Sequence, residues 1–97
     1  MIAEFLESHL NAPFPRGAHD LQLGDVDLEL LDADVVGLAQ SYLRSGRLAP
    51  DQREILEAVV ANLRAVIAEL PEEMRDYFAR LHALAVAVLS ERPIRGG

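Results

Sequence analysis

The stretch that decides the fold is residues 50–91, PDQREILEAVVANLRAVIAELPEEMRDYFARLHALAVAVLSE. Its large apolar residues recur at alternating spacings of three and four on both sides of Pro71, which is the periodicity of amphipathic helices. Pro50 suits the first position of a helix, and Pro71 can end one helix and open the next. The sequence therefore predicts helices over 50–70 and 71–91 that fold back as a long antiparallel hairpin, with a single helix kinked at Pro71 as the alternative.

Both long helices carry a wide apolar surface. The large residues of 50–70 cover an arc of about 140° when each residue advances by about 100°. Beyond Arg80 the helix over 71–91 is apolar nearly all round, which is typical of a buried helix. The first long helix is therefore expected to face more than one neighbour, and the second to be buried.

Two shorter helices are predicted ahead of the hairpin. The first covers 2–10, where the apolar residues fall on one helical face. The second covers 32–45, with Asp32 as its N-cap and Gly46 as its stop. The fold class is therefore all-α, in one helical domain over residues 1–97.

The segment 11–31 is predicted to be extended. Pro13 and Pro15 each push the preceding residue toward extended geometry. Residues 25–30, DVDLEL, alternate acidic and apolar side chains in the pattern of a half-buried strand. Because the sequence shows no second strand, this segment either lies across the helices or pairs with a strand only in a dimer.

The small size of the chain favours self-association. A chain of 97 residues has a thin core, burying only about 60–65% of the surface that its unfolded form exposes. Cysteine is absent, so disulfides cannot compensate. Oligomerisation is a general solution for such chains, and a homodimer is the expected state.

The charge of the chain narrows the class of partner. Sixteen acidic residues against nine basic ones, all of them arginine, give a net charge of −7. Phosphate backbones and anionic membranes repel such a protein, so nucleic acid and membranes are not expected partners, whereas a basic protein is. The longest apolar run, 83–89, is far shorter than the roughly 20 residues of a membrane span, and the expected location is the cytoplasm.

The sequence offers no pattern for catalysis, a cofactor or a metal. It contains no Thr or Cys, no glycine-rich phosphate loop and no dinucleotide pattern. The acids over 25–32 differ from a calcium loop because Leu30 and Val36 stand where such a loop needs glycine and glutamate. His9 and His82 are interpreted as residues at the boundary of apolar faces, and no two histidines share a helix face as metal ligands would. We therefore expect no enzyme.

Two faces rich in small residues are candidates for a partner interface. The first is on the reverse of the helix over 50–70 and contains Ala58, Ala61, Ala65 and Ala68. The second is on the last helix and contains Ala83, Val86 and Ala87. Small residues let another helix approach closely, but alanine is also the best helix former, so these positions are either interface or ordinary exposed surface.

Phe14 lies between two prolines in a stiff extended segment. A pre-organised aromatic side chain loses little entropy on binding, so Phe14 is a candidate anchor for a partner. The alternative is that it folds back to cover the protein's own core.

These observations predict a non-enzymatic protein–protein interaction module with an accessory or regulatory role. Its expected partners are a second copy of itself and a basic protein. The alternative is a small-ligand-binding protein or minor enzyme with a pocket between the hairpin and the 11–31 segment. The polar residues available to that pocket are Arg16, His19, Asp20 and Tyr42.

Overall fold

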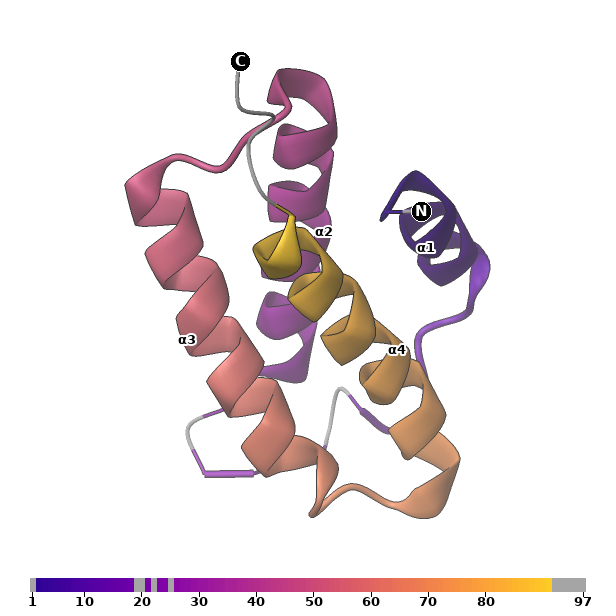
Figure 1. The fold of residues 1–97 in the computed structure, drawn as a ribbon. Coiled ribbons are helices and arrows are strands. Elements are labelled where there is room, and N and C mark those ends of the chain that lie inside the picture. The colour runs from indigo at the N-terminus through magenta and orange to yellow at the C-terminus, as the bar shows by residue number, and fades with distance from the viewer. Residues whose placement is uncertain (1, 19–20, 22, 25, 92–97) are drawn as a thin grey trace.

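The computed structural model describes residues 2–18, 21, 23–24 and 26–91. These residues form four helices and no strand: α1 (Ile2–Asn11), α2 (Leu28–Ser45), α3 (Pro50–Ile67) and α4 (Glu72–Ser90) (Figure 1). The only strand-like pairing in the described part of the chain is an isolated bridge between Leu23 and Val26. The prediction of an all-α fold is therefore confirmed.

Helix α4 is the centre of the structure. It packs against each of the other three helices, and in Figure 1 it lies between α3 and α1, with α2 behind it. Leu81, Leu84 and Ala85 are completely buried. The nearly uniform apolar character of this helix after Arg80 follows from its three neighbours, because each neighbour needs an apolar face to pack against.

Helix α3 has two neighbours, as the width of its apolar arc predicts. It packs against both α2 and α4, with Leu56, Val59 and Leu63 among its buried residues. The chain turns back at residues 68–71 before α4 begins (Figure 1). Leu70 in this turn is buried, and Arg75 donates a hydrogen bond from Nε to the carbonyl oxygen of Leu70 (2.9 Å), which fixes the turn to the first helical turn of α4.

The predicted start of the second helix is wrong. The helix begins at Leu28, and its N-cap is Asp27, whose Oδ1 accepts a hydrogen bond from the Leu30 N–H (3.1 Å). The described residues of 25–30 therefore form no strand, and the predicted bounds of the extended segment 11–31 are wrong at both ends, because Asn11 belongs to α1 and residues 28–31 belong to α2. A segment as short as 25–30 can fit both the alternation of a strand and the periodicity of a helix. In the structure, Leu28, Leu31 and Val35 fall at i, i+3 and i+7 and form the buried face of α2.

The end of α2 agrees with its prediction. Gly46 adopts a left-handed conformation (φ 79°), and its N–H donates a hydrogen bond to the carbonyl oxygen of Tyr42 (2.7 Å). This conformation is disfavoured for residues with a Cβ atom, which explains the glycine.

The Asp27 cap can be tested by mutation. Asp27→Ala removes the side-chain acceptor at the N-terminus of α2, and we expect the free energy of unfolding to fall by about 1 kcal/mol in urea denaturation. Asp34→Ala, a change of the same charge within the same helix, is the control and should have a smaller effect. Equal losses from the two variants would contradict the assignment of Asp27 as the cap.

Candidate functional site

A partly buried polar cluster joins three helices. His9 of α1 lies with Nε2 2.6 Å from Oδ1 of Asp32 in α2, and the hydroxyl of Tyr77 in α4 donates a hydrogen bond to Oδ2 of the same carboxylate (2.8 Å). The His9 and Tyr77 rings also contact each other, with centroids 4.6 Å apart. Both oxygens of the Asp32 carboxylate are therefore engaged, each by a different helix.

Aromatic side chains pack beside this cluster, and one of them, Phe14, comes from the loop between α1 and α2. Phe14 meets both Tyr77 and Phe78 edge to face, with ring centroids 5.5 and 5.9 Å apart, and Tyr77 meets Phe78 at 5.0 Å. Edge-to-face geometry is the favourable arrangement for aromatic rings. Phe14 is half-buried and lies over the protein's own core.

The environment of Tyr77 keeps its hydroxyl protonated. Burial raises the pKa of Tyr77 well above its ordinary value of 10.0, and the hydrogen bond to Asp32 and the charge of that carboxylate raise the pKa further. The positive charge of Arg80 opposes these effects. The phenol is therefore a permanent donor to Asp32 at neutral pH.

Two histidine nitrogens in the described structure are buried without a hydrogen-bond partner. They are Nδ1 of His9 and Nε2 of His82. Burial, followed by the nearby charge of Arg64, lowers the pKa of His82 and favours its neutral form. His9 is only 3% exposed, so its unpaired nitrogen has no access to solvent.

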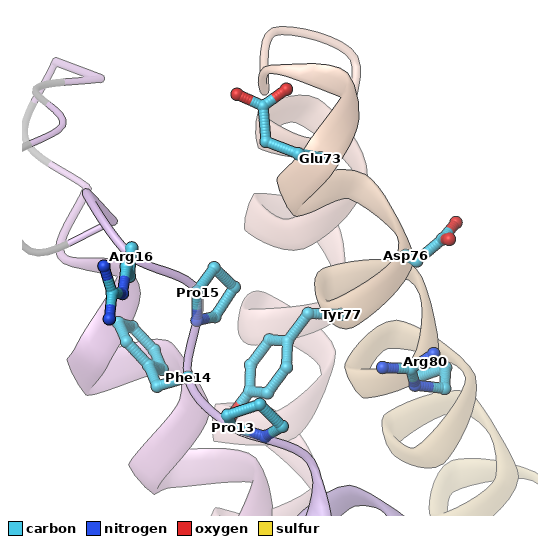
Figure 2. A pocket seen from close by; sticks show the side chains of 8 residues that line it. All are labelled: Pro13, Phe14, Pro15, Arg16, Glu73, Asp76, Tyr77 and Arg80. Atoms are coloured by element: carbon cyan, nitrogen blue, oxygen red, sulfur yellow. The ribbon is translucent and has the colours of Figure 1, made fainter.

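Two cavities border the polar cluster. The larger, of about 460 Å³, lies between residues 13–16 and α4. Figure 2 shows Tyr77 beside Pro13 and Pro15, with Arg16 on the loop and Arg80 on the helix, while Glu73 and Asp76 project away from the Tyr77 ring. The smaller cavity, of about 190 Å³, lies between α1 and α4 and is lined by Phe5, Ser8, His9, Arg80 and Ala83.

Of the polar residues predicted for a ligand pocket, the two that the structure describes, Arg16 and Tyr42, lie apart. Arg16 lines the larger cavity, but Tyr42 lies elsewhere, where its hydroxyl donates a hydrogen bond to Oε1 of Glu91 (3.3 Å). His19 and Asp20 lie outside the described residues.

The predicted small-residue faces lie on the surface of the described structure. The alanines at 58, 61 and 65 on α3 are exposed, as is Ala68, the residue that follows the helix. On α4, Ala83 and Val86 are exposed and Ala87 is half-buried. The α3 face adjoins a groove between α2 and α3, about 460 Å³ in volume, and Ala58 lines this groove. The residues that line it are Val26, Asp27, Leu30, Leu31, Asp34, Ile55, Ala58, Val59 and Asn62.

Sequence reasoning missed the polar cluster. The sequence predicts His9 as a boundary residue, but His9 is buried. It predicts Asp32 as an N-cap, but Asp32 lies within α2 and its side chain contacts two other helices. One signal was available, because His9 follows Ile2 and Leu6 at i+7 and i+3 and therefore lies on the buried face of α1. The identity of its partner depends on packing between helices, which no local pattern records.

The cluster lacks the parts of a nucleophilic site. Among the described residues, no Ser hydroxyl makes a hydrogen bond to a histidine, so no nucleophile is paired with a base. No group of three or more potential metal ligands occurs in the described ranges. The geometry is that of a polar link between helices.

Comparison with known proteins gives no functional lead. No protein-family model matches the chain, and no significant match is found among curated proteins or solved structures. None of the helices in the described part of the chain is both long and apolar enough to span a membrane.

The hydrogen bond from Tyr77 to Asp32 predicts how the stability of the protein depends on pH. The Tyr77 phenol loses its proton at a higher pH in the folded protein than in the unfolded chain. The stability that the protonated phenol contributes is therefore complete below pH about 10, and it is lost as the pH rises through the pKa of Tyr77 in the folded state. Tyr77→Phe should lower the free energy of unfolding by about 1.5–3 kcal/mol at neutral pH and reduce the alkaline decline. Urea denaturation across a pH series measures both effects.

Tyr42→Phe is the matched control for this experiment, because the Tyr42 hydroxyl makes only an exposed hydrogen bond. A Tyr77→Phe protein as stable as Tyr42→Phe at neutral pH, with an unchanged alkaline decline, would contradict the role given to the Tyr77 hydroxyl.

Proposed function

We propose that the protein is a non-enzymatic interaction module, with an accessory or regulatory role, that binds a basic segment of another protein in the groove between α2 and α3. The observation that carries this proposal is the placement of two large aliphatic side chains. Leu30 is 57% exposed and Ile55 is 49% exposed, and both line this one groove. Apolar side chains that gather at an exposed groove are typical of binding surfaces.

The negative charges at the rim of the groove favour a basic partner. Its lining includes the carboxylates of Asp27 and Asp34 and no basic side chain. Asp51 and Glu54, in the first turns of α3, are also exposed. A segment that carries aliphatic residues on one side and Arg or Lys on the other would match both the apolar floor and the acidic rim.

The same charges disfavour a second copy in this groove. In a two-fold symmetric dimer each groove meets its own equivalent, so the acidic rims would face each other. Like charges brought together across an interface oppose association. The net charge of −7 adds to this repulsion.

The exposed face of α4 suits the expected homodimer better than the groove between α2 and α3 does. Residues 81–90 contain no Asp, Glu, Lys or Arg, and Ala83 and Val86 are exposed. Two such faces can approach without bringing like charges together, and their small side chains allow close helix packing. We propose self-association through this face as a property separate from the groove.

The groove can be tested with a defined probe. The probe is a synthetic amphipathic helical peptide with Leu on one face and Lys on the other, and binding is followed by isothermal titration calorimetry and by mapping NMR shifts. Leu30→Asn and Ile55→Asn should each weaken binding by about tenfold, because each removes roughly 1–2 kcal/mol of apolar burial.

Leu43→Asn is the matched control, since Leu43 is a 42% exposed leucine of α2 outside the groove. A second control replaces each Lys of the peptide by Glu and should abolish binding. The proposal is wrong if Leu43→Asn weakens binding as much as Leu30→Asn, or if the acidic peptide binds equally well.

The homodimer is tested by light scattering coupled to gel filtration at micromolar concentration. We expect a dimer for the native chain and a monomer for Val86→Arg, which places two like charges in the interface. A native chain that is monomeric throughout would overturn the dimer and leave the groove proposal standing.

A further inference from the structure

Among the described residues that line the groove between α2 and α3, the negative charges come from one helix only. The α2 wall carries two carboxylates, those of Asp27 and Asp34. The lining residues of the α3 wall are all uncharged, namely Ile55, Ala58, Val59 and Asn62. A partner in this groove therefore meets acidic groups along one edge and uncharged side chains along the other.

Neither carboxylate has a basic partner in the described ranges. No salt bridge there involves Asp27 or Asp34. Oδ1 of Asp27 accepts the hydrogen bond that caps α2, which leaves Oδ2 for another donor. Asp27 is exposed and Asp34 is half-buried, so a cation from outside the chain can reach both side chains.

The two carboxylates are spaced along α2 by close to two helical turns. Positions 27 and 34 are seven residues apart, which corresponds to about 10 Å along the helix axis. Residues with this spacing lie on the same side of a helix. Leu30 lies between them in the sequence, lines the same groove and is 57% exposed. The α2 wall thus presents an acid, an aliphatic side chain and a second acid in line.

The walls of the groove favour a helical partner over an extended one. Both walls are helices, whose backbone groups are hydrogen-bonded along their length and offer no strand edge for pairing. A helix satisfies its own backbone groups, whereas an extended segment would leave its groups unpaired over the apolar floor. The α3 wall also suits a helix, because the side chains of Ala58 and the neighbouring exposed Ala61 are small enough for close approach.

We propose that the partner of this groove is an amphipathic helix with two basic residues at i and i+7 along one edge. The basic residues pair with Asp27 and Asp34, and aliphatic side chains of the partner lie against Leu30 and Ile55. The uncharged edge of the partner helix packs against Ala58. This inference rests on the function proposed above and adds the conformation of the partner and the spacing of its charges.

The helices of the chain itself do not offer this pattern. The sequence contains no lysine, and no two of its nine arginines are seven residues apart. A second copy therefore cannot place a cation beside each carboxylate from one helix. The occupant of the groove is a helix of a different protein.

The test is isothermal titration calorimetry of the full chain with three synthetic helical peptides of identical composition. Each peptide has one aliphatic face and two Lys, placed at i and i+7, at i and i+4, or at i and i+9, where the second Lys lies on the opposite face. The i, i+7 peptide should bind about threefold to fivefold more tightly than the other two, because it alone places a cation beside each carboxylate.

Two substitutions assign this preference to the groove. Asp27→Asn removes the charge and keeps a good N-cap side chain, and Asp34→Asn removes the second charge. In the double variant the i, i+7 peptide should lose its advantage over the other peptides. The matched control combines Glu73→Gln with Asp76→Asn, which also removes two exposed charges but on α4, outside the groove, and the preference should persist.

The possible outcomes separate this inference from the function on which it rests. Equal binding of the three peptides to the native chain would overturn the spacing and leave the groove proposal standing. A preference that persists in the Asp27→Asn, Asp34→Asn double variant would overturn the spacing as well, because other groups would then bind the Lys side chains. Failure of all three peptides to bind would overturn both proposals.

Discussion

The structure depends on the coverage of α4. From residue 81 to residue 90 this helix carries no Asp, Glu, Lys or Arg, so most of its circumference must be removed from water. Three helices of the same chain provide that coverage, and Leu81, Leu84 and Val88 become buried in consequence. Over residues 81–90, Ala83, Val86 and Ser90 stay exposed. One helix thus packs against three others, which gathers the small core around α4.

Helix α1 is the shortest of the three helices that pack against α4. Its buried side chains are Ile2, Leu6 and His9. An imidazole among apolar residues is costly unless it is hydrogen-bonded, so its position in the fold depends on Asp32. The carboxylate is held in turn by Tyr77, which couples α1 to α2 and α4 together. The cluster thereby fixes one position for a helix whose apolar contacts alone would be less specific.

The periodic parts of the sequence were predictable and the contacts between helices were not. The ends of α3 and α4 are marked by Pro50, Pro71 and the apolar spacing, and the observed bounds differ from the predicted ones by no more than three residues. The start of α2 was mistaken because DVDLEL satisfies both the alternation of a strand and the first turns of a helix. The role of Asp32 could not be read locally, since its partners are 23 and 45 residues away in the chain.

The functional proposals concern surfaces that stay exposed after the helices have packed. All of these proposals assume that the other helices of the same chain cover α4. Native-state hydrogen exchange tests this most directly. The amides of Leu81, Leu84, Ala85 and Val88 should exchange only through global unfolding, and they should stay the most protected amides of the chain when the protein is diluted until it is monomeric. Loss of this protection in the monomer, so that these amides exchange as fast as those of the helix ends, would contradict the account, because it would show that α4 needs a second copy to be covered.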